Sequence, residues 1–252
     1  MPLARASAVA FAGNFAPADV APAEPLGEPD RIDGGHDLYD VVAGSTIAVP
    51  QAALFGPLTH YRYDMVLPAG LKTFCVRLQP AAACQLFGLD PLEMVDNFVT
   101  LDLPQGCQAA LQAARDWQEM AEATDHCLMD FVGGKRCDDP VAREARRLRQ
   151  QRGTLAIQDL AETAGLSLRH FQRRFRKLTG LNPKLYARIC RIGHAVHRKE
   201  LDPEASWTEL ALEAGYADQS HFIRDFKELT GIAPGGFLRG QSPIMRYPKW
   251  DE

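Results

Sequence analysis

The sequence predicts an α+β protein: a small mixed β/α domain followed by an all-α domain with two helix-turn-helix units joined by a long helix. Three observations lead to this prediction. The second half contains an internal repeat, the first half contains short alternating segments bounded by Gly and Pro, and the two halves carry opposite net charge. A chain of 252 residues is long enough to form two domains.

The repeat consists of residues 165–183, GLSLRHFQRRFRKLTGLNP, and residues 215–234, GYADQSHFIRDFKELTGIAP. Phe171 corresponds to Phe222 at an offset of 51 residues, whereas Gly165 corresponds to Gly215 at an offset of 50. The second copy therefore has one extra residue after its glycine. Two copies are too few for a solenoid, so the sequence indicates one supersecondary unit used twice.

Each copy is predicted to form a helix, a short turn containing glycine, and a second helix. Apolar residues spaced by three and four lie on one helical face before each glycine. These residues are Ile157, Leu160, Ala161 and Ala164 in the first copy, and Leu210, Ala211 and Ala214 in the second. Ser167 and Asp218 are expected to cap the second helix of each copy. That pattern is typical of the helix-turn-helix.

The polar face of each second helix predicts the function. It carries Arg169, Gln172, Arg173, Arg176 and Lys177 in the first copy, and Gln219, Ser220, His221, Ile223, Arg224 and Lys227 in the second. Side chains of these polar types can hydrogen-bond to base edges in the major groove, which admits a helix. The alternative is an ordinary solvated face. Two such helices in register, each after a glycine turn, favour DNA binding over that alternative.

Residues 141–239 resemble the DNA-binding domain of the AraC/XylS family of bacterial transcription regulators. The resemblance covers both units, the linking helix and the one-residue difference between the copies, and it is strongest in ALEAGYADQSHFIRDFKELTGIAP. It implies base-reading roles for Arg169, Gln172 and Arg173 in the first unit, and for Ser220, His221 and Arg224 in the second, with Gln219 beside them. The first unit departs from the second in being much more basic.

Further cations are expected to contact phosphates and to position the protein on the duplex. These are Arg176, Lys177, Lys184, Arg188 and Lys227. The linking helix is predicted from residues 183–201, where Leu185, Ile189, Ile192 and Val196 form an apolar stripe after an Asn-Pro start. It would hold both reading helices against one DNA face, about 34 Å apart, and a shorter separation would require bent DNA.

The charge distribution agrees with one nucleic-acid-binding half. Residues 1–140 contain 8 Lys and Arg against 19 Asp and Glu, a net charge of −11, and residues 141–252 contain 20 against 13, a net charge of +7. Residues 163–199 contain ten basic residues and no acidic one. This asymmetry indicates a polyanion partner for the second half only, and argues against a module that binds protein alone.

The first half is predicted to hold strands at residues 38–43, 46–49, 59–66 and 72–78, followed by helices in AAACQLFG, PLEMVDNF and residues 105–131. We divide the chain into an unstructured arm (1–29), a sensing or dimerisation domain (30–132), a linker (133–140), the DNA-binding domain (141–240) and a tail (241–252). Residues 72–103 resemble the N-terminal domain of one branch of AraC-type regulators. Better-known members carry a cupin-like barrel there, and the strand-forming stretch here is shorter than a barrel needs.

The sequence favours no enzymatic role, metal or cofactor. The six cysteines form no CxxC pair, and we expect most of them to be small buried hydrophobes in a reducing cytoplasm, with Cys137 exposed. His36 and His60 stand apart from each other, and no phosphate-binding or nucleophile motif is present. The alternative function is a DNA-binding module fused to an enzymatic or reactive-cysteine domain, which would need an accessible cysteine of low pKa.

The resulting prediction is a cytoplasmic, sequence-specific transcription regulator. Its partners are expected to be double-stranded DNA and, from the family resemblance, RNA polymerase. A small-molecule effector and a homodimer are left open, and no membrane segment is predicted because no apolar run reaches about 18 residues.

Overall fold

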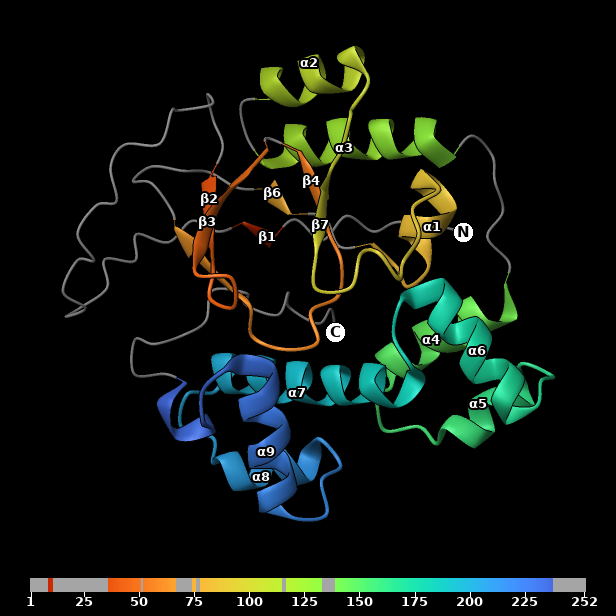
Figure 1. The fold of residues 1–252 in the computed structure, drawn as a ribbon, viewed down its shortest axis with the longest axis vertical. Coiled ribbons are helices and arrows are strands. Elements are labelled where there is room, and N and C mark those ends of the chain that lie inside the picture. Colours follow the sequence, from red (N-terminus) through yellow and green to blue (C-terminus); the bar gives the residue numbers. More distant parts are fainter. Residues whose placement is uncertain are drawn as a thin grey trace.

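The computed structural model describes residues 9–10, 36–50, 52–66, 74–75, 78–114, 117–132 and 139–237 (Figure 1). The first half contains β1 (Val9–Ala10), β2 (His36–Asp40), β3 (Ser45–Val49), β4 (Ala53–Phe55), β5 (Tyr63–Val66), β6 (Phe74–Cys75), α1 (Ala82–Phe87), β7 (Phe98–Thr100), α2 (Gln105–Ala113) and α3 (Trp117–Val132). The second half contains α4 (Pro140–Gln150), α5 (Ile157–Thr163), α6 (Leu168–Thr179), α7 (Pro183–Leu201), α8 (Trp207–Glu213), α9 (Gln219–Thr230) and the short 3-10 helix η1 (Pro234–Gly236). The predicted fold class is confirmed.

The described strands of the N-terminal half form three small antiparallel sheets. The largest has the order β3-β2-β5, with Leu38 opposite Ile47 on one side and Met65 on the other. The other two sheets pair β4 with β7 and β1 with β6. Leu38, Val49 and Tyr63 are buried at the centre of this half, and α2 and α3 lie along one end of the strands (Figure 1).

The structure corrects several predicted boundaries in this half. The first predicted strand ends at Asp40, because residues 41–44 form a turn in which the Asp40 carboxylate accepts hydrogen bonds from the backbone N–H groups of Val42 and Ala43. The predicted strand at residues 59–66 begins only at Tyr63, and β4 and β7 were not predicted. Val9–Ala10, within the predicted unstructured arm, pairs with β6, and the remainder of that arm lies outside the described residues.

The segment PLEMVDNF, predicted to be helical, is a turn over residues 91–96 that leads into β7. Asp96 explains the difference, because it takes a left-handed conformation (φ +55°) that ends the turn. Its carboxylate accepts hydrogen bonds from the backbone N–H and the hydroxyl of Thr59, at 2.6 and 2.7 Å. Its carbonyl accepts from Arg62 and Tyr63. This Asp96 network joins the loop before β5 to the turn before β7.

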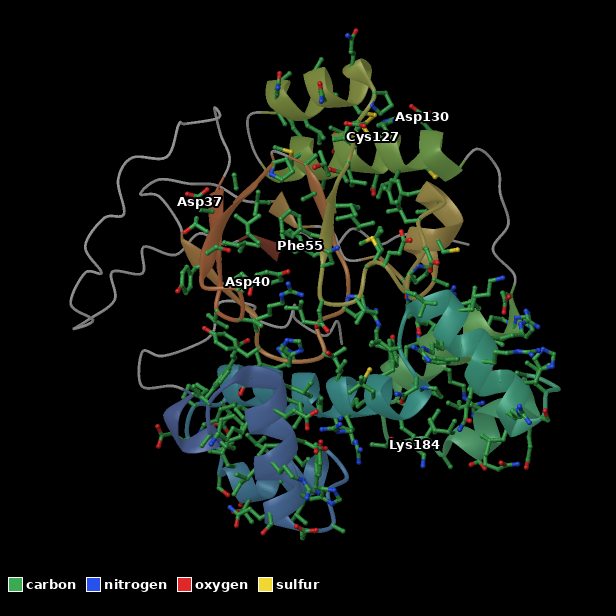
Figure 2. The ribbon with its side chains drawn as sticks, viewed as in Figure 1. Asp37, Asp40, Phe55, Cys127, Asp130 and Lys184 are labelled. Atoms are coloured by element: carbon green, nitrogen blue, oxygen red, sulfur yellow. A yellow bond between two sulfur atoms is a disulfide. The ribbon has the colours of Figure 1, made fainter. Side chains whose placement is uncertain are left out.

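Residues 105–131, predicted as one long helix, form the two helices α2 and α3, which pack against each other. Cys107 in α2 and Cys127 in α3 are both buried and are joined by a disulfide, which corrects our expectation that they are free small hydrophobes. Figure 2 labels Cys127 where the two helices face each other. Cys137, most of the predicted linker and the predicted tail lie outside the described residues.

The C-terminal half contains two separate hydrophobic cores, one for each repeat. The first core includes Leu148 of α4, Leu160 of α5, and Phe171 and Phe175 of α6. The equivalent side chains of the second core come from α7, α8 and α9 and include Val196, Leu210, Phe222 and Phe226. These side chains are at most 1% exposed, so the apolar face predicted for each unit is buried as expected.

Helix α7 belongs to both cores. Ala187, near its start, packs in the first core, whereas Ile192, Ala195 and Val196 pack in the second. The Asn182 side chain caps the helix by accepting a hydrogen bond from the backbone N–H of Leu185, and Pro183 is its first residue. The prediction of one long connecting helix packed against both units is confirmed. At 1.5 Å per residue its 19 residues span about 28 Å.

Each repeat ends with the same hydrogen bonds, made by the hydroxyl of a threonine in the last turn of its recognition helix. The hydroxyl of Thr179 donates to a carbonyl of its own helix, at Phe175, and also lies within bonding distance of the Leu181 backbone. Thr230 makes the equivalent contacts with Phe226 and Ile232. The glycine that follows each threonine, Gly180 or Gly231, is left-handed, with φ values of +79° and +78°. Glycine is favoured there because it has no Cβ to clash.

The N-terminal half contacts both repeats at these equivalent glycines. A Cβ on Gly180 would lie 2.3 Å from the carbonyl oxygen of Pro91, and a Cβ on Gly231 would lie 2.6 Å from the ring of Tyr61. Pro91 belongs to the turn before β7 and Tyr61 to the loop before β5. The Asp96 network therefore joins the two segments that cover the ends of α6 and α9.

Candidate nucleic-acid interface

Helix α6 has one apolar face and one cationic face. It starts after Ser167, whose hydroxyl accepts a hydrogen bond from the backbone N–H of His170, and it ends at Gly180. Phe171 and Phe175 are fully buried and lie 5.7 Å apart between ring centroids. On the outer side Arg169, Arg173, Arg176 and Lys177 are exposed, and Gln172 is half-buried. The structure therefore presents the predicted base-reading and phosphate-contacting residues of the first unit to solvent.

Helix α9 repeats this arrangement. The Asp218 carboxylate caps it by accepting a 2.8 Å hydrogen bond from the backbone N–H of His221. Phe222 and Phe226 are fully buried, as their counterparts in α6 are. The exposed residues of the helix include Gln219, Ser220, His221, Ile223, Arg224 and Lys227. All four residues predicted to read bases in the second unit therefore lie on its surface.

The turns before α6 and α9 share one hydrogen-bond pattern. Gly165 and Gly215 are both left-handed, with φ values of +68° and +76°. The backbone N–H groups of Leu166 and Tyr216 donate to equivalent carbonyls, at Ala161 and Ala211. The second turn then holds one residue more before its capping residue, which accounts for the different offsets within the repeat.

Two residues of the second unit have partners within it. The side-chain amide of Gln219 donates to the hydroxyl of Thr208 in α8 at 3.2 Å, so Gln219 also ties the recognition helix to the helix before it. The Nδ1 atom of His221 lies 3.8 Å from the Asp218 carboxylate. Both side chains remain exposed, so the contacts orient them without burying them.

Arg188 does not lie as predicted for a phosphate contact. Its guanidinium donates to the carboxylates of Asp225 and Glu228 in α9, at 2.9 and 2.6 Å. The Asp225 carboxylate is 6% exposed and accepts a second hydrogen bond from the Tyr216 hydroxyl at 3.0 Å. Arg188 therefore joins α7 to α9 inside the domain. We assign it this structural role instead of a phosphate contact. Lys184, at the start of α7, is exposed (Figure 2).

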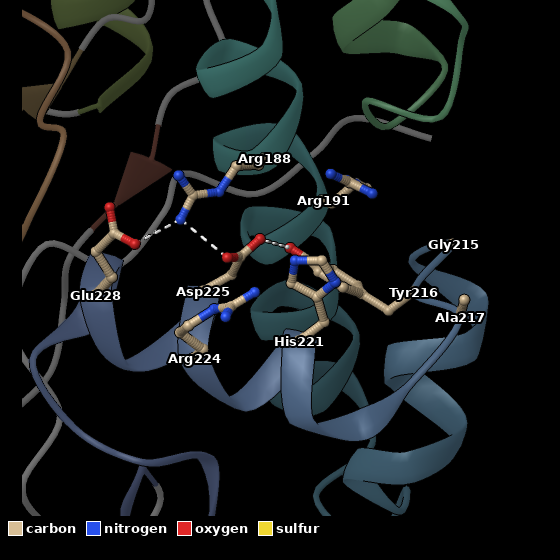
Figure 3. Close-up of a pocket in the computed structure, with 9 residues that line it drawn as sticks. All are labelled: Arg188, Arg191, Gly215, Tyr216, Ala217, His221, Arg224, Asp225 and Glu228. Atoms are coloured by element: carbon tan, nitrogen blue, oxygen red, sulfur yellow. Dashed lines mark hydrogen bonds and ion pairs between the residues drawn. The ribbon is translucent and has the colours of Figure 1, made fainter.

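A hollow of about 470 Å³ lies between α7, α9 and the turn before α9 (Figure 3). Its lining is mostly charged and comprises Arg188, Arg191, Gly215, Tyr216, Ala217, His221, Arg224, Asp225 and Glu228. Arg191 lies over the ring of Tyr216, with 4.6 Å between its guanidinium carbon and the ring centroid. Sequence reasoning missed Arg191. The available signal was its place in the stretch of chain that has ten cations and no carboxylate.

The structure offers little support for metal or thiol chemistry. Within the described ranges no group of three metal-ligating side chains comes together, and His60 instead lies near Asp96 and Thr59. Burial raises the pKa of the Cys190 thiol to about 12, which is opposite to the shift that a nucleophilic cysteine needs. No described helix combines the length and the apolarity that crossing a bilayer requires.

Comparison with known proteins also identifies a helix-turn-helix domain in the C-terminal half. A family model described as a helix-turn-helix domain matches residues 160–240, which include both recognition helices and α7. The transcriptional activator RhaS of Escherichia coli strain SE11 is 31% identical over 87 residues, covering 34% of this chain and 31% of RhaS. The C-terminal domain is of the AraC/XylS type. Its two units and linking helix are the features on which the sequence resemblance depends.

Two further proteins are similar to this chain in sequence or in fold. The bifunctional transcriptional activator/DNA repair enzyme Ada of E. coli strain K12 is 26% identical over 152 residues, covering 56% of this chain and 42% of Ada. A solved structure of ToxT from Vibrio cholerae has a TM-score of 0.50 at 11% identity, covering 82% of this chain and 86% of ToxT. At that identity the likeness shows the fold alone. The chain spans less than half the length of the curated relatives it matches.

Proposed function

We propose that the protein is a sequence-specific regulator of transcription that inserts α6 and α9 into two neighbouring major-groove segments of one DNA duplex. The observation that carries this proposal is the equivalence of the two helices. Each buries a Phe pair in its own core and exposes polar side chains able to hydrogen-bond with base edges. A shared helix, α7, packs in both cores and holds the two units together.

The exposed side chains divide into two roles. We assign base contacts to Arg169, Gln172, Arg173, Gln219, Ser220, His221 and Arg224, and phosphate contacts to Arg176, Lys177, Lys184 and Lys227. Ile223 is 39% exposed on the same face of α9 and is suited to contact with a thymine methyl group. A separation of α6 and α9 below one turn of DNA, about 34 Å, would require the bound duplex to bend.

The test separates base contacts from phosphate contacts. The purified protein is first used to select binding sites from a random pool of duplexes, and affinities are then measured on the selected site and on single-base variants. We expect Arg173→Ala to relax preference at one position, a loss of about 1–3 kcal/mol of discrimination. We expect Lys184→Ala to weaken binding to all sequences alike and to reduce the salt dependence. Equal losses of discrimination in both variants would contradict the assignment.

The partners of the whole protein follow from the same proposal. RhaS and Ada are named as transcriptional activators, and we propose activation, with RNA polymerase as the protein partner. We assign effector sensing or dimerisation to the N-terminal half and a cytoplasmic location to the protein. Sedimentation of the protein with and without the selected duplex distinguishes one bound chain from two.

A DNA-binding module with a reactive-cysteine domain is the second candidate, and Ada bears the name of a repair enzyme. Three of the described cysteines do not favour it here, whereas Cys84 is a free, half-buried thiol. Cys107 and Cys127 are paired, and Cys190 is buried with a raised pKa. Labelling of the native protein with a thiol reagent is expected to show no cysteine that reacts faster than a free thiol at neutral pH. A hyper-reactive cysteine would revive this candidate.

A further inference from the structure

The hollow between α7 and α9 is lined by Arg191, which has no role in the DNA contacts proposed above. Within the described part of the chain, the guanidinium of Arg191 has no hydrogen-bond or ion-pair partner, and its Nε atom is buried. The Nε atom of the neighbouring Arg188 is also buried without a partner among the described residues, so this feature alone does not distinguish Arg191. The two arginines differ at the other end of the guanidinium, because Nη2 of Arg188 is held by two carboxylates and no described carboxylate is paired with Arg191.

Arg191 is held in place by an aromatic ring rather than by an acid. Its guanidinium lies over Tyr216, and the Tyr216 hydroxyl is fixed by its hydrogen bond to Asp225. Burial raises the pKa of Tyr216, so the hydroxyl stays protonated and remains a donor to that carboxylate. Stacking of this kind orients a guanidinium while leaving its N–H groups available. Arg191 is therefore oriented before any ligand arrives.

The charges around the hollow indicate an anion. Asp225 and Glu228 are the acidic lining residues, and both are bound by Arg188. In the part of the chain that the structure describes, Arg191 and Arg224 are the lining arginines without a carboxylate partner. Six of the nine lining residues are arginine, histidine, aspartate or glutamate. Figure 3 shows Arg191 on α7, and His221 and Arg224 on α9, around the same space.

The position of the hollow identifies the anion. His221 and Arg224 line it and also belong to the exposed face of α9 that we place in the major groove. Phosphates of the DNA backbone border that groove, and most protein contacts that set the register of a complex are made to them. We propose that Arg191 binds one phosphate of the DNA backbone in this hollow, beside the segment read by α9. The inference rests on the proposed function and adds a positioning residue to it.

The decisive measurement is the slope of the logarithm of affinity against the logarithm of salt concentration, on the selected site and on an unrelated duplex. Each phosphate contact contributes about 0.9 to this slope on B-DNA. We expect Arg191→Ala to reduce the slope by about that amount on both duplexes and to leave the base preference unchanged. We expect Arg191→Lys, which keeps the charge, to retain most of the slope.

Two controls separate a phosphate contact from a structural role. Arg198→Ala removes the same charge two turns further along α7, where the side chain is paired with Glu213, and we expect it to keep the wild-type slope. If Arg191 acts only by packing on Tyr216, both Arg191 variants lose affinity with the slope unchanged. That result overturns the inference, as does an equal change in slope for Arg198→Ala.

The failure of this inference differs from a failure of the proposed function. If the wild-type protein shows no salt-dependent preference for any duplex, the proposed function is wrong. If it shows that preference and Arg191→Ala leaves the slope intact, only the role of Arg191 is wrong. A titration with inorganic phosphate alone gives a further check. Binding of phosphate as tight as that of the duplex would overturn the inference, because the hollow would then be a site for a free anion.

Discussion

Arg174 in α6 and Asp225 in α9 stand at equivalent positions of the two repeats and carry opposite charges, yet each pairs with the element that precedes its own unit. Arg174 donates to Asp139, the capping residue of α4, at 2.6 Å. Asp225 accepts from Arg188 of α7 at 2.9 Å. The reversed charges maintain the same connection between the recognition helix and its scaffold. They also contribute to the more basic character of the first unit.

The two ion pairs are predicted to differ in their contribution to stability. The Asp225 carboxylate is 6% exposed, and its removal leaves the buried Tyr216 hydroxyl without its acceptor. We expect Asp225→Ala to lower the free energy of unfolding by about 3 kcal/mol. Arg174 is 37% exposed, so Arg174→Ala should cost about 1 kcal/mol or less. Urea denaturation of both variants tests this. Equal losses of unfolding free energy would show that the difference in burial does not make the two ion pairs differ in their contribution to stability.

The threonine hydroxyls at the ends of α6 and α9 are predicted to contribute equally to the free energy of unfolding. Thr179→Val and Thr230→Val each remove a buried hydroxyl that bonds within the helix and to the residues after it. Each change should lower the free energy of unfolding by about 1–2 kcal/mol. Thr163→Val is the control, because Thr163 is exposed and bonds to Asp159. A loss as large in the control would indicate a general effect of valine in these helices.

The contact of the N-terminal half with the first repeat is tested by two glycine substitutions. Gly165 and Gly180 are both left-handed, so alanine at either position costs about 1–2 kcal/mol. A Cβ on Gly165 meets nothing within 4 Å, whereas one on Gly180 meets the Pro91 carbonyl. We therefore expect Gly180→Ala to be about 1–3 kcal/mol more destabilising than Gly165→Ala in thermal or urea unfolding. Equal effects would mean that Pro91 does not cover Gly180.

Burial of His194 is predicted to make stability depend on pH. Burial lowers the pKa of His194 from 6.5 to about 4, with smaller contributions from Arg152, Arg198 and His197, so the ring is neutral in the folded protein. Below pH 6.5 the unfolded chain binds a proton that the folded protein does not, and stability falls as pH falls towards 4. The expected loss is at most about 1.4 kcal/mol for each pH unit.

The variant that tests this is His194→Leu, which should flatten the dependence of the unfolding free energy on pH between 6.5 and 4. The same pH dependence in wild type and His194→Leu would assign the titration to another group.

The repeats could be predicted from the sequence because their signals are local. Phe pairs four residues apart, capping residues and Thr-Gly ends all act within one helix, and Phe171 and Phe222 are buried as predicted. The partners of Arg188 could not be predicted in this way. Its carboxylates lie 37 and 40 residues further along the chain, and Asp225 appears from spacing alone to be an ordinary polar residue.

The same limit explains the errors in the N-terminal half. Strand β4 pairs with β7, and Phe55 opposes Phe98 across 43 residues of chain, so no local pattern marks either strand. The helix-like composition of residues 91–96 was overridden by long-range bonds from Thr59 and Arg62 to Asp96. Arg191 was missed because its site exists only where α7, α9 and the turn before α9 meet.

The contacts at Gly180 and Gly231 limit how the two reading helices can move. Asp96 links the segment that covers Gly180 to the segment that covers Gly231. A change in the distance between α6 and α9 must therefore disturb at least one of these contacts. It must lift the Pro91 carbonyl, displace the Tyr61 ring, or release Thr59 or Arg62 from Asp96. The N-terminal half thus rests on the same point of each repeat, and its two contacting segments are joined through both the carboxylate and the backbone carbonyl of Asp96.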